Sequence, residues 1–129
     1  MSTRATYNFK DKWHGEHCVY IHHDGYPNGA AYYFNNALMQ KQKCNVDSFF
    51  RANLKAEHTS SHDAHGDTEY RYEIWVNSET HETMVKGIAR CINKGYQHWE
   101  VFFRDTLTKF IETYPELIQL HEQEKNNGR

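Results

Sequence analysis

The fold is decided by the stretch YRYEIWVNSETHETMVKGIARCINKGYQHWEVFFR, residues 70–104, in which apolar and polar side chains alternate over most of the length. Alternation with a period of two is typical of strands that bury one face. The pattern predicts three consecutive strands, at 70–76, 83–92 and 98–104. Asn93-Lys94-Gly95 is expected to form the tight turn between the last two strands. In the third strand, one face is expected to carry Trp99, Val101 and Phe103.

Two further strands are predicted near the N-terminus, where they form a hairpin around a turn that contains Gly15. In the first, at 6–10, the apolar residues Tyr7 and Phe9 alternate with polar ones. In the second, at 18–23, one face is expected to carry Val19, Ile21 and His23.

Helices are predicted where a capping residue precedes apolar side chains at helical spacing. Pro27 suits the first turn of a helix that extends to Lys41, and Asn45 is expected to cap a second helix. The apolar stripe of that second helix would comprise Val46, Phe49, Phe50 and Leu54. Thr106 is expected to cap a third helix, and Pro115 to end it. Pro115 would also open a last helix that carries Leu117, Ile118 and Leu120.

The predicted order of elements, ββααβββα, indicates an α+β fold: an antiparallel sheet of about five strands with helices packed on one face. A chain of 129 residues fits a single domain, which is expected to span 1–124, with a polar tail at 125–129. From Glu57 to Thr68 the sequence is rich in His, Ser, Asp and Gly, and it predicts a long polar loop.

The composition excludes several classes of protein. The chain has 15 Lys and Arg against 17 Asp and Glu, a net charge of −2, so direct nucleic-acid binding is not expected. No apolar run of about 18 residues predicts a membrane span, and no apolar segment near the N-terminus predicts a secretory signal. The wide spacing of Cys18, Cys44 and Cys91 indicates reduced thiols, so a cytoplasmic location is expected.

A first candidate site lies at the turn His22-His23-Asp24-Gly25-Tyr26, between the second strand and the first helix. Imidazoles beside a carboxylate can hold a divalent metal or perform acid–base chemistry. The favoured interpretation is structural: His23 would be buried and hydrogen-bonded, and Asp24 would accept backbone N–H groups of the turn. Binding of a ligand or contact with a partner is the second interpretation, and catalysis is the third.

A second candidate is a cluster in the polar loop, in which His58, His62 and His65 are the candidate metal ligands and Asp63 and Asp67 lie beside them in the sequence. A metal ion needs several donors that converge, and the spacing of these residues allows it. However, no H-E-x-x-H or other zinc signature is present. The simpler interpretation is a solvated loop, so no cofactor is expected, and a divalent metal at these histidines is the weaker hypothesis.

Exposed aromatic side chains are the third candidate. If Tyr70 and Tyr72 face the core, Trp75 must point outward on the same side as Arg71, and Tyr20 is expected to be exposed as well. Tyr, Trp and Arg mixed on a surface are typical of interface hot spots, although such aromatics can also cover the edge of a small core. The residues predicted to contact a partner are Tyr20, His22, Asp24, Tyr26, Arg71 and Trp75.

The opening Met1-Ser2-Thr3-Arg4 and the later stretch from Tyr20 to Gly29 resemble a group of small phage, prophage and bacterial proteins. These open with Met-(Gly/Ser)-Thr-Arg and carry a His-x-Asp-Gly-Tyr-Pro turn after the second strand. The resemblance covers about residues 1–34, and His23 stands where the group commonly has Trp. The group is largely uncharacterised, so the resemblance implies a setting rather than an activity. In that setting, small proteins bind and block a host protein, as anti-CRISPR and other counter-defence inhibitors do.

The leading hypothesis is therefore a binding protein that engages a host protein, since no strong catalytic motif is present. The alternative is a metal-dependent hydrolase or phosphoesterase. It would join His22, His23 and Asp24 to His58, His62 or His65. A third hypothesis is a binder that responds to pH, because the chain has ten histidines and histidine titrates near pH 6.5.

Overall fold

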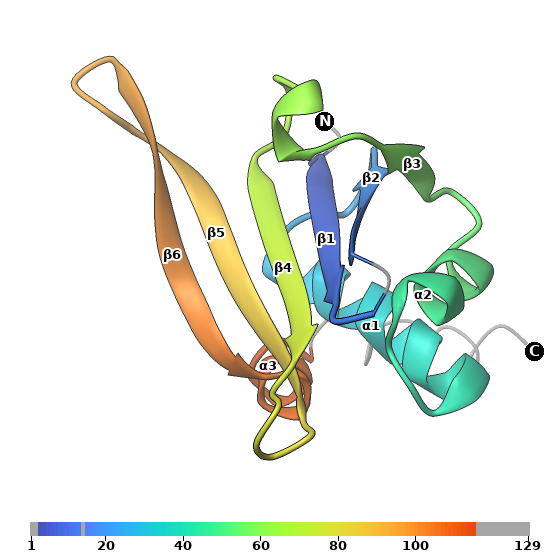
Figure 1. Ribbon diagram of the computed structural model, residues 1–129. Coiled ribbons are helices and arrows are strands. Elements are labelled where there is room, and N and C mark those ends of the chain that lie inside the picture. Colours follow the sequence, from blue (N-terminus) through green and yellow to red (C-terminus); the bar gives the residue numbers. More distant parts are fainter. Residues whose placement is uncertain (1–2, 14, 116–129) are drawn as a thin grey trace, which may run out of the picture.

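A computed structural model of the chain describes residues 3–13 and 15–115. The predicted helix with Leu117, Ile118 and Leu120, and the predicted tail at 125–129, lie outside the described residues. The elements in chain order are β1 (Ala5–Asp11), β2 (Gly15–Ile21), α1 (Pro27–Lys41), α2 (Val46–Ala52), β3 (Glu57–Thr59), the 3-10 helix η1 (His62–Ala64), β4 (Tyr70–Val76), β5 (Thr83–Asn93), β6 (Tyr96–Thr106) and α3 (Leu107–Thr113). The fold is α+β, as predicted, and Figure 1 shows its arrangement.

The sheet is mixed and six-stranded, with the order β3-β2-β1-β4-β5-β6. The prediction of a purely antiparallel sheet of about five strands is corrected in two respects. β1 pairs with β4 in parallel, because the chain crosses over between β2 and β4 instead of returning by a short turn. The segment expected to be a loop also contains β3, whose three residues pair with β2 but are too few to display alternation.

The core lies between this sheet and the helices, and it is largely aromatic. Tyr7 of β1 and Tyr72 of β4 are neighbours in register, and their ring centroids lie 5.0 Å apart in a stacked arrangement. Phe34 of α1 packs edge-on against both rings, and Phe110 of α3 packs against Phe34 and Tyr72. Much of the aromatic content of the sequence is therefore used to join the helices to one face of the sheet.

The starts of the helices confirm the predicted caps. Pro27 occupies the first turn of α1, and the side chain of Asn45 accepts a hydrogen bond from the Ser48 backbone N–H at 2.9 Å. Thr106 caps α3 in the same way. The expected place of Leu54 in the apolar stripe of α2 is wrong: α2 ends at Ala52, and Leu54 is 92% exposed. Within the described part of the chain, no helix combines the length and the apolar character needed to cross a membrane.

An irregularity in β6 corrects the predicted faces of that strand. The register shifts by one residue between Gly87 and Ile88 of β5, so that Phe102 becomes an extra residue in β6. Phe102 and Phe103 both turn toward the helix side, where they contact Tyr114. Trp99 and Val101 therefore lie on the opposite face from Phe103. Gly87 makes room for the bulge, because a Cβ atom there would lie 2.5 Å from the Phe102 ring.

Candidate binding surface

One face of strands β4, β5 and β6 is not covered by α1, α2 or α3, because these helices pack on the other face. We call this surface the open face. It comprises Arg71, Glu73, Trp75, Met84, Lys86, Ile88, Arg90, Trp99, Val101 and Arg104. Figure 1 shows that the β5–β6 hairpin extends away from the rest of the described domain, so a long part of this surface is accessible. The side chain of Asp63, from η1, reaches its edge and contacts Arg71 at 3.0 Å.

Two tryptophans of the open face are each accompanied by an arginine. The guanidinium of Arg71 lies 4.0 Å from the centroid of the Trp99 ring, and that of Arg104 lies 5.8 Å from the Trp75 ring. Both distances are within the range of cation–π attraction. Trp75 and Trp99 are half-buried, so each exposes part of its ring. The outward orientation predicted for Trp75 and Arg71 is therefore observed, and Trp99 is a member of this surface that the sequence reasoning missed.

The open face is basic, although the chain as a whole is slightly acidic. Four of its side chains are cationic, namely Arg71, Lys86, Arg90 and Arg104, and Glu73 alone among those named above is acidic. Glu73 is already shared between Lys86 at 3.9 Å and Lys10 of β1 at 3.5 Å. Beside these charges lie aliphatic side chains, of which Val101 is 53% exposed. The surface thus combines positive charge with apolar area, which is the composition of a protein interface.

Tyr20 is buried, with 2% exposure, so its expected exposure is wrong. Its ring stacks on His65 with centroids 3.7 Å apart, and its hydroxyl donates to both carboxylate oxygens of Asp67. Asp67 also pairs with Arg4 at 3.2 Å. Burial and the bonded carboxylate raise the pKa of Tyr20 to about 12. Tyr20 therefore anchors the loop that contains His65 onto β2 and is not available to a partner.

The turn from His22 to Tyr26 is attached to the sheet through its backbone. The Gly25 N–H donates to the Thr3 carbonyl at 2.8 Å, and the Gly25 carbonyl accepts from the Tyr72 hydroxyl at 2.6 Å. Asp24 has a positive φ of 56°, and a Cβ atom on Gly29 would lie 1.8 Å from the Asp24 carbonyl oxygen. Much of the unusual composition of this turn is explained by close backbone packing.

In this turn the side chains of His22, His23 and Asp24 are exposed, and that of Tyr26 is half-buried. The prediction that His23 is buried is wrong, because β2 ends at Ile21 and the chain turns outward before His23. His22 Nε2 lies 2.5 Å from Glu57 of β3, and the Tyr26 hydroxyl donates to Asp24 at 3.2 Å. These groups occupy one end of the sheet, away from the Trp75 end of β4. They therefore form a surface separate from that around Trp75.

The three loop histidines have different neighbours. His58 stacks on Phe50 with centroids 4.2 Å apart, His62 Nδ1 lies 2.6 Å from the Thr6 hydroxyl, and His65 covers Tyr20. In the described part of the chain they do not meet as one ligand set, either with one another or with His22, His23 and Asp24. Among the residues described, the geometry therefore does not bring together the histidines and Asp24 on which the hydrolase alternative was based.

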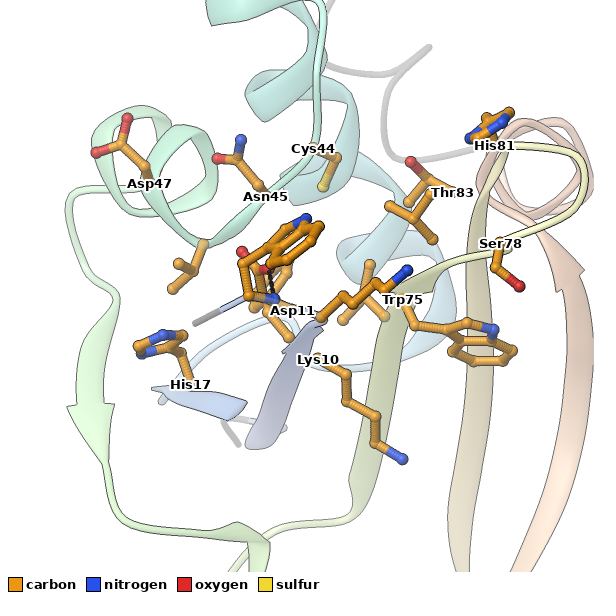
Figure 2. A pocket seen from close by; sticks show the side chains of 16 residues that line it. Lys10, Asp11, His17, Cys44, Asn45, Asp47, Trp75, Ser78, His81 and Thr83 are labelled. Carbon is orange, nitrogen blue, oxygen red and sulfur yellow. Dashed lines mark hydrogen bonds between the residues drawn. The ribbon is translucent and has the colours of Figure 1, made fainter. Parts of the chain in front are cut away.

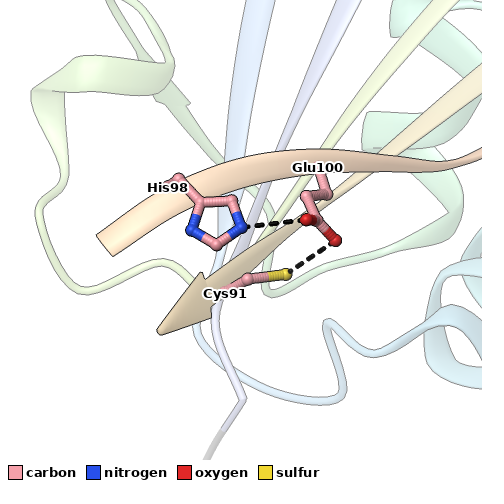
Figure 3. Close-up of side chains that lie close together, drawn as sticks. All are labelled: Cys91, His98 and Glu100. Carbon is pink, nitrogen blue, oxygen red and sulfur yellow. Dashed lines mark hydrogen bonds and ion pairs between the residues drawn. The ribbon is translucent and has the colours of Figure 1, made fainter. Parts of the chain in front are cut away.

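A different group of potential metal ligands is present on the β5–β6 hairpin. Cys91, His98 and Glu100 each offer a ligand atom, and these atoms lie within 4.8 Å of one another (Figure 3). The sequence reasoning missed this group, because the residues belong to two strands and follow no zinc signature. The signal that could have found it is the predicted turn at Asn93-Lys94-Gly95, which brings Cys91 and His98 opposite each other.

A cleft of about 910 Å³ lies where the parallel strands β1 and β4 end. Its apolar floor includes Phe9 and Ile74. Figure 2 shows Asn45 and Asp47 on one side of the cleft and Ser78 and His81 on the other. Trp75 also lines it, so the cleft adjoins the open face.

No protein-family model, no curated protein and no solved structure matches this chain. The class that its structure defines is an α+β domain with a mixed six-stranded sheet, helices on one face and a basic, tryptophan-containing surface on the other. Its function is inferred from those side chains.

Proposed function

We propose that this chain is a binding module that engages an acidic protein partner through the open face. The observation that carries the proposal is the pairing of Trp99 with Arg71 and of Trp75 with Arg104 on a sheet surface that α1, α2 and α3 leave uncovered. Tryptophan and arginine are the residues most often found at binding hot spots. The guanidinium groups limit the rotamers of the rings, so little side-chain entropy remains to be lost on binding.

Charge complementarity defines the chemistry of the partner. The open face presents four cations against two carboxylates: Glu73, whose charge is shared by two lysines, and Asp63 at its edge, which pairs with Arg71. A partner with Asp or Glu around an apolar centre would pair with the arginines while its apolar side chains cover Ile88 and Val101. Binding of this kind is faster at low ionic strength, because exposed charges steer the encounter and salt screens them.

A protein fits this surface better than a nucleic acid does. Strand-based binders of single-stranded nucleic acids stack bases on free aromatic faces. Here the Trp99 ring is already covered by the Arg71 guanidinium at 4.0 Å, and Arg71 is itself paired with Asp63. The aliphatic side chains of Met84, Ile88 and Val101 have no equivalent role in binding phosphates.

The resemblance of the N-terminal segment to small phage and prophage proteins suggests where to find the partner. A host protein is the class of partner that this setting implies, and inhibition of a host defence protein is one form of the proposal. A lysate of bacterial cells is therefore the source from which to capture it.

The test compares one charged substitution on the open face with a matched one elsewhere. Val101→Glu places a negative charge on the open face, opposite Ile88, at a side chain that is 53% exposed. Leu54→Glu makes a similar change beyond α2, at a side chain that is 92% exposed. A partner captured by the wild-type chain is purified, and its affinity for each variant is measured by calorimetry at two salt concentrations.

We expect Val101→Glu to weaken binding at least about tenfold, which corresponds to about 1.4 kcal/mol, and Leu54→Glu to leave it unchanged. Arg104→Glu is expected to weaken binding further at low salt than at high salt. Unchanged affinity in both open-face variants, with unchanged melting curves, would contradict the proposal. Loss of the captured partner after nuclease treatment would instead identify a nucleic acid as the ligand.

A further inference from the structure

We propose that Cys91, His98 and Glu100 bind a zinc ion on the helix-side face of the β5–β6 hairpin. The proposal is independent of the binding function above, because these side chains lie on the opposite face of the hairpin from Trp99 and Arg90. It rests on the strand register, on the distances between the ligand atoms and on the chemistry of the three donors.

The register gives these residues a common face. Cys91 of β5 pairs directly with His98 of β6, and Glu100 follows His98 by two residues, so its side chain leaves the same side of the strand. The hairpin closes through the two-residue turn Lys94-Gly95, where φ is 51° and 85°. Positive φ at both turn residues is the type I′ geometry, which matches the twist of the paired strands. The ligands are therefore held on a regular two-stranded frame.

The distances between the ligand atoms can be compared with those of a tetrahedral zinc site. With Zn–S of about 2.3 Å and Zn–N or Zn–O of about 2.0–2.1 Å, tetrahedral angles require about 3.5 Å between sulfur and oxygen and about 3.4 Å between nitrogen and oxygen. Cys91 Sγ lies 3.5 Å from Glu100 Oε2, and His98 Nε2 lies 2.9 Å from Glu100 Oε1. The two distances end on different oxygens of Glu100, so zinc would enter once a single Glu100 oxygen turns toward both the sulfur and the nitrogen. One ligand atom from each residue already lies within 4.8 Å of the other two.

Zinc suits this donor set better than calcium or magnesium. Thiolate sulfur and imidazole nitrogen are soft or intermediate ligands, whereas calcium and magnesium take oxygen ligands. Three protein ligands leave one tetrahedral position for water, as in zinc sites that remain open. Cys91 and His98 are half-buried and Glu100 is exposed, so the site is reachable from solvent.

The same contacts describe the site before a metal binds. The Cys91 thiol donates to Glu100, and burial together with this hydrogen bond raises the pKa of the thiol. The hydrogen bond from His98 lowers the pKa of Glu100, which therefore stays ionised at neutral pH. Zinc binding would replace the thiol proton, which leaves to solvent, and it would form a Zn–S bond in its place.

Cobalt(II) is the probe for this site, because it takes the same tetrahedral geometry and absorbs light. Protein purified without a histidine tag is treated with a chelator under reducing conditions and titrated with cobalt chloride. We expect one equivalent to produce the intense visible bands of tetrahedral cobalt and a thiolate-to-cobalt charge-transfer band in the ultraviolet. Zinc should then displace the cobalt and abolish both features.

Three ligand variants and two matched controls assign the site. Cys91→Ser should abolish the charge-transfer band, and His98→Gln and Glu100→Gln should weaken cobalt binding about 10- to 100-fold or more. His81→Gln and Glu79→Gln change the same residue types at exposed positions of the β4–β5 loop and should bind like the wild type. Absence of the charge-transfer band in the wild-type chain, or its persistence in Cys91→Ser, would overturn the proposal. Circular dichroism of each variant checks that the fold is retained, which is expected because all three ligands are at least partly exposed.

Discussion

The same substitution, tyrosine to phenylalanine, is expected to have opposite effects at two stacked residues of the core. Tyr7 and Tyr72 are both fully buried, and their ring centroids lie 5.0 Å apart. The Tyr72 hydroxyl donates to the Gly25 carbonyl at 2.6 Å. The Tyr7 hydroxyl has no hydrogen-bond partner among the residues that the structure describes. The two hydroxyls thus differ in bonding but hardly in environment.

The magnitudes follow from the cost of an unpaired polar group. Tyr72→Phe removes a short hydrogen bond and takes a donor from a buried carbonyl, which together should cost about 2 kcal/mol. With an unfolding entropy of about 2.1 cal/mol/K per residue, a chain of 129 residues would lose about 7 °C in melting temperature. Tyr7→Phe removes a hydroxyl that is desolvated without compensation. It should be neutral or stabilise the fold by up to about 1 kcal/mol.

Urea denaturation followed by circular dichroism measures both effects as shifts of the midpoint at constant slope. The double variant measures the coupling between the two effects, because the stacked rings are in contact and residues in contact depart from additivity. A loss in Tyr7→Phe as large as that in Tyr72→Phe would refute the reasoning. So would a neutral Tyr72→Phe, because the turn at Gly25 would then not depend on this bond.

Two further predictions concern local interactions. Burial, and secondarily the nearby Arg71, lowers the pKa of His62 below its usual value of about 6.5. Between the two pKa values, the unfolded chain therefore binds a proton at this histidine that the folded chain does not bind. The free energy of unfolding should fall as the pH drops from about 6.5 toward the pKa of the folded state. His62→Gln should flatten this part of a urea-midpoint curve relative to His81→Gln, and an equal slope in the two variants would contradict the assignment. Asn45→Ala should lower the free energy of unfolding by about 1 kcal/mol, because it removes the acceptor of the Ser48 N–H. Asn45→Asp keeps an acceptor and should lower it by less in the same urea titration. Equal losses of stability in the two variants would argue against the cap.

The features that the sequence predicted correctly are those set by nearest neighbours in the chain. Alternation assigned β4 its observed bounds, because each side chain of a strand faces opposite to the one before it. The caps at Asn45 and Thr106 were predictable for a similar reason, since a cap involves residues only three positions apart. Trp75 and Arg71 were placed on the outer face of β4 by the same alternation.

The errors arose where the outcome depends on segments far apart in the chain. Tyr20 was expected to be exposed because it lies on the outer face of β2, but His65 and Asp67 return from a later loop to cover it. Alternation carries no information about strand direction, so the parallel pairing of β1 with β4 was not predictable from it. The adjacent apolar residues Phe102 and Phe103 were the one local sign of the bulge, because regular alternation would separate them.

That bulge determines the residues on both faces of the distal hairpin. If Phe102 were paired with Ile88 instead of forming the bulge, the register at Gly87 would continue, so that Trp99 lay opposite Cys91 and Glu100 lay opposite Arg90. Trp99 would then lie on the helix side, away from Arg71. Glu100 would lie on the open face instead and would reduce the positive charge of that face. His98 and Glu100 would also turn away from Cys91, so the proposed zinc ligands would no longer share a face. Both proposed sites therefore depend on one backbone irregularity, which Gly87 permits because it leaves space for the Phe102 ring.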